Sequence, residues 1–276
     1  MIRIGLNRFD EHSYLNGKKK SSLYEYASHL PIVELDTSYY HIPKVAVVEK
    51  WVNQVPANFR FILKFPRYMT NQEPLPPETT MAEEVAKLKV SFAPLFESNK
   101  LFCVLAQFSA SFKCTKESVA HLRQLRHHFP DWPIAVELRD ASWYQARYLD
   151  SMRTFMTAQE FSLAVIDEPK KLATTIPLDA YVTNSQFTLC RFHGRNDLGW
   201  QATGPNAQAV RTNYHYSPNE LIELKGIVEQ VATQSAEVAV IFNNNAGGDA
   251  AENGVELIKI MELDYDGLNP TQLGLF

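Results

Sequence analysis

The 276 residues carry 27 Lys and Arg against 31 Asp and Glu, a net charge of −4, and 45% of them are hydrophobic. This balance excludes a global basic field for nucleic acid, so we expect no direct nucleic-acid binding. No run of about 18 apolar residues exists, so no membrane span is expected. We also expect a cytoplasmic protein, because no signal peptide precedes the first strand-like segment and the three cysteines show no disulfide or metal-ligand spacing.

The first half of the chain alternates short apolar runs with amphipathic stretches. Strands are predicted at 3–6, 32–36, 59–65, 101–108 and 134–138. Helices are predicted at 22–30 with Ser22 as cap, at 44–55 after Pro43, and at 79–98 and 116–129. The polar segment 66–78, with three prolines, is too long to be only a connector.

The second half continues this alternation with one gap. Helices are predicted at 143–159, 218–234 and 249–262, and strands at 162–167, 187–193 and 237–242. The segment 168–186 has no clean helical stripe, so its helix is expected to be degenerate or missing. A second long loop is expected at 194–216, which contains three glycines.

Eight strands that alternate with helices predict an α/β fold with a parallel sheet and right-handed crossovers. Eight such units favour a single (β/α)8 TIM barrel over residues 1–268, followed by a tail at 269–276. A doubly wound open sheet is the alternative, but no glycine-rich loop follows the first strand, as a dinucleotide site would require.

A ring of polar side chains is expected where the strands end. In 134–138, alternation places Glu137, and Arg139 beyond it, on one face. Every other strand also ends in a polar residue, and barrel strands converge at their carboxyl ends. The inward-facing candidates are Asn7, Glu34, Asp36, Lys64, Gln107, Glu137, Arg139, Asp167, Arg191, His193 and Asn243.

Some of these residue types suit acid/base chemistry. Glu34 and Glu137 lie in hydrophobic runs, so either is a candidate general acid or base; the alternative is a salt bridge to Arg139 or Lys64. Lys64 is expected to carry substrate charge or, less readily, to form a Schiff base. His193 could shuttle protons or be a satisfied core histidine. The predicted catalytic set is Glu34, Lys64, Glu137, Arg139 and His193.

Other residues are candidates for substrate binding. Arg139, Arg191 and Arg195 suggest a site for a carboxylate or phosphate. The segment that begins with Asn243 and Asn244 precedes a helix, where barrels often bind phosphate; the alternative is a tight turn capped by Asp249. Tyr39, Tyr40, Trp143 and Trp200 could stack on a ring or simply pack. The predicted binding set is Asn7, Tyr40, Gln107, Trp143, Asp167, Arg191, Arg195, Asn243 and Asn244.

No motif fixes a reaction, since the sequence has no GxSxG, HExxH or Walker A motif. Several carboxylates and one histidine could hold a divalent metal, but their spacing gives no metal fingerprint. We therefore expect no cofactor.

Five motifs together resemble the YecE-like family, also called domain of unknown function 72. They are VELDTSYYHIP at 33–43, LAQFSASF at 105–112, AVELRDASWY at 135–144, RFHGR at 191–195 and VIFNNNAGGDAAENG at 240–254. The resemblance covers almost the whole chain and implies a TIM barrel, but no established reaction. The family often has Thr-His where this chain has Thr70-Asn71, and prolines where it has Phe108-Ser109-Ala110.

The last five residues, QLGLF, are similar to the pentapeptide by which bacterial proteins bind the DNA sliding clamp. The resemblance implies that Gln272, Leu273, Leu275 and Phe276 fill pockets on that partner. The alternative is a tail that packs on its own barrel.

Our leading hypothesis is an enzyme, a hydrolase or isomerase, that uses acid/base chemistry on a small anionic substrate, phosphorylated or sugar-like. The rival is a non-catalytic protein that docks on the sliding clamp through its tail. A barrel kept only for assembly is the third alternative.

Overall fold

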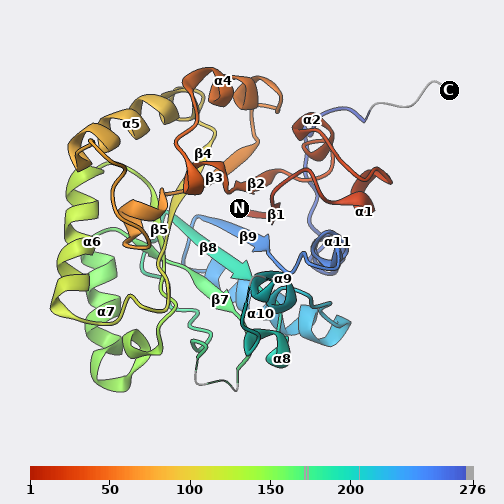
Figure 1. Cartoon of the computed structure of the whole chain (residues 1–276). Coiled ribbons are helices and arrows are strands. Elements are labelled where there is room, and N and C mark those ends of the chain that lie inside the picture. The colour runs from red at the N-terminus through yellow and green to blue at the C-terminus, as the bar shows by residue number, and fades with distance from the viewer. Residues whose placement is uncertain (171, 173, 205, 272–276) are drawn as a thin grey trace.

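A computed structural model describes residues 1–170, 172, 174–204 and 206–271, without the side chain at 208. Parallel strands in its centre form a single sheet that curves into a barrel, and helices surround it (Figure 1). The predicted TIM-barrel fold is confirmed. The strands are β1 (Ile2–Asn7), β2 (Ile32–Leu35), β3 (Arg60–Lys64), β4 (Leu101–Gln107), β5 (Ile134–Glu137), β6 (Ser162–Leu163), β7 (Val165–Asp167), β8 (Phe187–Phe192) and β9 (Glu237–Phe242).

The predicted strand at 162–167 is divided in two at Ala164. Among the described residues, β6 pairs only with β5 and β7 only with β8, so the sheet order runs β6-β5-β4-β3-β2-β1-β9-β8-β7. The amide of Ala164 still donates to the carbonyl of Val136 (2.9 Å). The chain itself therefore closes the ring between β6 and β7.

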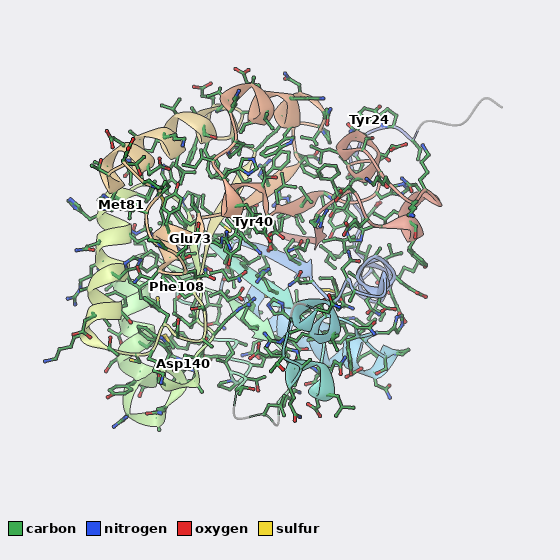
Figure 2. All side chains as sticks on the ribbon, viewed as in Figure 1. Tyr24, Tyr40, Glu73, Met81, Phe108 and Asp140 are labelled. Carbon is green, nitrogen blue, oxygen red and sulfur yellow. The ribbon has the colours of Figure 1, made fainter. Side chains whose placement is uncertain are left out.

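In the part of the chain that the structure describes, six long helices cover the outside of the sheet. They are α4 (Val45–Asn53), α5 (Met81–Glu97), α6 (Lys116–His128), α7 (Ala146–Ala158), α10 (Pro218–Ala232) and α11 (Asp249–Ile260). Capping boxes begin α5 at Thr80 and α10 at Ser217. In each, the hydroxyl of the capping residue accepts a hydrogen bond from the amide of the third helical residue, a glutamate, whose carboxylate accepts one from the amide of the capping residue. Side chains fill the space between helices and strands (Figure 2).

Shorter helices lie in the loops. They are α1 (Ser13–Asn16), α2 (Leu23–Tyr26), α3 (Thr37–Tyr40), α8 (Asp197–Trp200), α9 (Ala207–Arg211) and the 3₁₀ turns η1 (Arg67–Thr70) and η2 (Ala141–Tyr144). Both long loops thus contain helical turns: η1 lies in 66–78, and α8 and α9 lie in 194–216. As expected, the described residues of 168–186 form no helix.

Most helix boundaries agree with the prediction within two residues, but two differ by more. The helix at 22–30 ends at Tyr26, and the chain continues through hydrogen-bonded turns to Leu30, the residue before Pro31. The helix predicted from Trp143 begins only at Ala146. Gln145, with φ −64° and ψ 139°, separates it from the turn η2.

Two apolar layers stabilise the fold. Inside the barrel, residues such as Ile32, Leu105 and Ala239 form one buried cluster, and a larger cluster lies between sheet and helices. Gly5 allows β2 to approach β1, because a Cβ there would lie 2.1 Å from the carbonyl oxygen of Ile32. Within the described residues, no helix is both long and apolar enough to cross a membrane.

Candidate active site

A cavity of about 710 Å³ opens at the end of the barrel where the strands terminate. Strand-end residues form its floor, and the loops after β3 and β8 supply part of its wall. It is lined by Asn7, Asp36, Tyr39, Tyr40, Lys64, Gln72, Gln107, Ser109, Ala110, Arg139, Glu168, Thr174, His193, Trp200, Gln201, Ala202, Thr203, Arg211, Thr212 and Asn243. This is the end at which TIM-barrel enzymes carry their active sites.

An arginine and two glutamates form a buried cluster beneath this floor. The Arg191 Nε and Nη2 atoms donate to the two carboxylate oxygens of Glu34 at 2.8 and 2.6 Å. Its Nη1 donates to Glu137. All three side chains are fully buried. Each guanidinium nitrogen of Arg191 thus donates to a carboxylate of the protein, and Arg191 does not line the cavity, so this placement favours a structural role over the predicted contact with substrate.

Two further cations extend this network toward the cavity. The Lys64 ammonium lies 2.7 Å from Asp36 and 3.3 Å from Glu34. Arg139 donates through Nε to Glu137 at 2.5 Å, and its side chain is partly exposed. Asn7 donates its amide to Glu34 (2.9 Å). The sequence-predicted residues Asn7, Glu34, Asp36, Lys64, Glu137, Arg139, Arg191 and His193 are therefore brought together.

Charged neighbours shift the pKa values of Glu137 and Lys64. Burial opposes the charge of Glu137, but Arg139 and Arg191 outweigh it and hold the pKa of that carboxyl well below its usual range. Burial also opposes the charge of Lys64, yet Asp36 and Glu34 raise its pKa. A permanently ionised Glu137 makes a poor proton donor, and a charged Lys64 suits electrostatic stabilisation better than Schiff-base formation.

His193 lies at the cavity floor as a neutral imidazole. Burial, together with the charge of Arg191, lowers its pKa well below the usual value. The Asn243 amide nitrogen lies 2.9 Å from Nδ1, and the Arg191 Nη1 atom lies 3.4 Å from Nε2; the shorter contact, with Asn243 as donor, favours the tautomer that carries the proton on Nε2. The Nε2 atom is 3.8 Å from a Glu137 oxygen. His193 therefore offers a hydrogen-bond donor without a positive charge.

Glu168 is the functional candidate that sequence reasoning missed. It lines the cavity but is only 4% exposed. Burial raises its pKa to about 7, although the amide of Ile176 donates to its Oε1 atom (2.6 Å) and Arg139 opposes the shift. From the sequence, we take the last polar residue of each predicted strand as a site candidate. This choice includes Asp167 and leaves out Glu168, which follows the last residue of β7. Its position directly after a strand was the available indication.

Asp167 and Arg195 pair with each other beside the cavity. The Arg195 Nε and Nη2 atoms donate to Asp167 at 2.7 to 3.0 Å, and Nη1 donates to Glu223 (2.9 Å). The Tyr216 hydroxyl donates to the same Asp167 carboxylate (2.7 Å) and accepts from the Gly194 amide. Neither Asp167 nor Arg195 lines the cavity, so their placement indicates a role in holding the loop after β8.

Trp143 and Asn244 also lie away from the cavity. The Trp143 indole is buried against Phe112 and donates to its carbonyl (2.7 Å). Asn244 donates to the carbonyl of Tyr214 and the side chain of Asn253. Both placements favour packing and loop attachment over contact with substrate.

The start of α11 does not favour phosphate. Its first turn carries Asp249 and Glu252, and Asp249 pairs with His215 (3.0 Å). These carboxylates place negative charge at the helix end that would otherwise attract an anion.

Aromatic and amide side chains complete the cavity wall. Tyr39 and Tyr40 meet edge to face at 5.2 Å, and Tyr40, labelled in Figure 2, is 60% exposed. The side-chain oxygen of Gln72 accepts a hydrogen bond from the Tyr39 hydroxyl, and its side-chain nitrogen donates to the backbone carbonyl of Gln107. These groups suit a ligand with apolar faces and hydroxyl groups.

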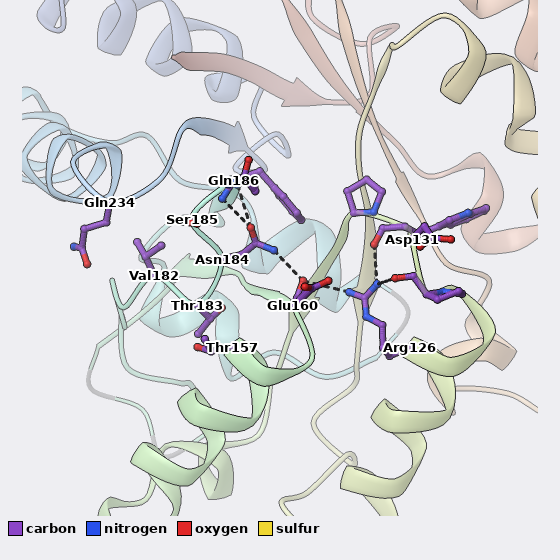
Figure 3. Close-up of a pocket in the computed structure, with 14 residues that line it drawn as sticks. Arg126, Asp131, Thr157, Glu160, Val182, Thr183, Asn184, Ser185, Gln186 and Gln234 are labelled. Carbon is purple, nitrogen blue, oxygen red and sulfur yellow. Dashed lines mark hydrogen bonds between the residues drawn. The ribbon is translucent and has the colours of Figure 1, made fainter.

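A second cavity, of about 770 Å³, lies at the opposite end of the barrel (Figure 3). Its residues come from segments that precede β5, β6, β8 and β9. Arg126 donates there to five backbone carbonyls, among them those of Gln159 and Glu160. Its guanidinium therefore connects the segment before β5 to the segment before β6. This is the end of a barrel associated with stability rather than catalysis.

Within the described residues, no group of three or more His, Cys, Asp or Glu side chains is placed to hold a metal ion.

The proposed clamp-binding residues lie outside the described residues; they are Gln272, Leu273, Leu275 and Phe276. Before them, Asn269 is held by hydrogen bonds to the carbonyls of Ala27, Tyr24 and Gln54.

Comparisons with known proteins agree with this fold. The chain is 40% identical to UPF0759 protein YunF of Bacillus subtilis (strain 168) over the full length of both, and 39% identical to UPF0759 protein YecE of Escherichia coli (strain K12) over 27% of each. A DUF72 family protein from Enterococcus faecalis V583 superimposes with a TM-score of 0.95 at 49% identity, covering 99% of this chain and 100% of the other. One from Thermotoga maritima MSB8 gives 0.80 at 28% identity, covering 95% and 100%. A family model described as "Protein of unknown function DUF72" matches residues 3–273, and the chain belongs to this family.

Proposed function

We propose that the protein is an enzyme that performs acid/base chemistry on a small anionic, sugar-like substrate. The substrate binds in the cavity of about 710 Å³ at the carboxyl ends of the strands, which we call the mouth cavity. Glu168 carries this proposal. A nearly buried carboxyl with a pKa of about 7, facing a cavity at the catalytic end of a barrel, can both give and take a proton near neutral pH.

The other residues are placed for supporting roles. Lys64 and Arg139 supply positive charge at the cavity surface, where negative charge would develop. His193 supplies a neutral donor. The cluster of Arg191, Glu34 and Glu137 holds the strand ends in position from beneath. Transfer of a proton at a carbon next to a carbonyl, or to a leaving oxygen, fits this set, which corresponds to an isomerase or hydrolase.

A proton-exchange experiment tests the proposal before any single substrate has been identified. Pools of sugar acids, sugar phosphates and glycosides are incubated with the protein in D2O and followed by proton NMR. Isomerase chemistry removes individual C–H signals through deuterium exchange, and hydrolysis produces new signals. We expect the Glu168→Gln variant to lower the rate at least 100-fold. A compound that is converted equally fast by Glu168→Gln would overturn the role of Glu168.

A further inference from the structure

One arginine of the cavity has no carboxylate partner in the described part of the chain. Arg191 and Arg195 are each bound by two or more carboxylates, and Arg139 is bound to Glu137. Arg211, the last residue of α9, lines the cavity and forms no ion pair among the described residues. Its guanidinium makes a long hydrogen bond, 3.5 Å, to the carbonyl of Ala202.

The neighbourhood of Arg211 contains a second unused donor. The Arg211 guanidinium lies over the Trp200 ring, 5.8 Å from its centre. Both Nε of Arg211 and Nε1 of Trp200 are shielded from solvent and find no hydrogen-bond acceptor among the described residues. A buried donor without a partner is unfavourable, so two neighbouring ones indicate a place where an acceptor is supplied from outside.

The cavity also contains an unused acceptor. Gln107, at the end of β4, is only 9% exposed, and its Oε1 atom has no donor among the described residues. A bound group that satisfies Gln107 must therefore carry a hydrogen-bond donor, as a hydroxyl does.

We propose that Arg211 and Trp200 form an anion-recognition subsite in the mouth cavity. The subsite takes the carboxylate or phosphate end of a hydroxylated small acid, and Gln107 accepts a hydrogen bond from a hydroxyl of the same molecule. The planar guanidinium and the indole N–H both donate to oxygen, which is the pattern that oxyanions require. This inference rests on the proposed function and adds to it the chemical class of substrate and the place of its charged end.

Fluorine NMR of protein labelled with 5-fluorotryptophan tests the subsite directly. The Trp200 resonance is assigned with Trp200→Phe, and D-gluconate, D-ribose 5-phosphate and inorganic phosphate are titrated, with uncharged D-glucitol as the matched control. We expect a saturable shift of the Trp200 resonance with at least one of the two hydroxylated acids and none with D-glucitol. No saturable shift with any of the anions overturns the subsite.

Variants separate the contributions of the two ends. Arg211→Gln should weaken binding of the hydroxylated acid at least 10-fold, and Arg211→Lys less, because a point charge lacks the planar fork. Arg123→Gln on α6, outside the cavity, changes the net charge equally and should leave binding unchanged. Gln107→Leu should weaken binding of the hydroxylated acid but not of inorganic phosphate. Equal affinity in Arg211→Gln and wild type contradicts the anion subsite, and equal affinity in Gln107→Leu contradicts the hydroxyl contact.

The two proposals fail in different ways. Glu168→Gln is expected to retain anion binding while it loses turnover. If Glu168→Gln keeps full turnover and Arg211→Gln still loses binding, only the acid/base role is wrong. If Arg211→Gln binds normally and Glu168→Gln is inactive, only the subsite is wrong.

Discussion

Arg191 on β8 holds Glu34 on β2 by two hydrogen bonds, at 2.8 and 2.6 Å, although β1 and β9 separate these strands in the sheet. The two residues are 157 positions apart in the sequence, and both are fully buried. The ion pair therefore connects strands across the barrel interior, directly under the cavity.

Removal of this cation should destabilise the barrel strongly. Arg191→Met leaves Glu34 and Glu137 buried without their main partner, and we expect the free energy of unfolding to fall by about 3–5 kcal/mol at pH 7. Urea denaturation measures the change. Arg153→Met breaks the partly exposed pair with Asp179 and should cost about 1 kcal/mol or less. Equal losses in the two variants would contradict the dominant role of the buried cluster.

Glu168 should make stability depend on pH in the acid-to-neutral range. Its pKa rises from 4.5 to about 7 on folding, so the folded protein keeps a proton that the unfolded chain releases. Its contribution to the free energy of unfolding therefore falls as pH rises through this range, by up to about 3 kcal/mol.

Glu168→Gln should remove this slope. The difference in unfolding free energy between wild type and variant, measured by urea denaturation from pH 4 to 8, isolates the contribution. Glu49→Gln, on the exposed face of α4, is the control for the effect of a Glu-to-Gln change on the unfolding free energy at each pH. A difference that is constant over this range argues against a raised pKa of Glu168.

The Asn243 amide should determine the tautomer of His193. In the wild type we expect nitrogen NMR to show a neutral ring with the proton on Nε2 throughout pH 5.5–8, because its pKa lies well below the ordinary value. Asn243→Asp replaces the donor by an acceptor and should move the proton to Nδ1 and raise the pKa. A ring that is protonated at pH 6 in the wild type, or a tautomer unchanged in Asn243→Asp, contradicts this assignment.

Clamp binding stays a prediction from the last five residues. If it holds, immobilised full-length protein captures purified bacterial sliding clamp, and deletion of 272–276 abolishes capture. A chain with Gln272, Leu273 and Phe276 replaced by alanine is the matched control of equal length and should behave like the deletion. Capture that persists in both variants excludes this mode of binding.

The strand ends could be predicted because two regularities act together. Alternation along a strand places Glu34, Lys64 and Glu137 on the inner face, and parallel strands bring such residues to one end of the barrel. These regularities depend only on local sequence and on the number of βα units. The prediction of the strand-end residues therefore does not require the exact boundaries of every other strand.

Residues outside the strands could not be placed in the same way. Trp143 belongs to the turn η2 and Asn244 to the segment after β9, and their side chains make packing and loop contacts. Arg211 lies in a loop segment that has no strand register to follow. Glu168 is one residue beyond a short strand, and its importance depends on burial, which only tertiary structure reveals.

The division of a barrel strand at Ala164 has a consequence for motion. Among the described residues, two residue pairs connect β6 to β5 and three connect β7 to β8, whereas five connect β1 to β9 and six connect β9 to β8, so this seam has fewer paired residues than β9 shares with either neighbour. We expect backbone amides of 162–167 to exchange with deuterated solvent sooner than those of β1 and β9. Because Glu168 follows β7 directly, the same local opening would let water reach its carboxyl group and exchange its proton.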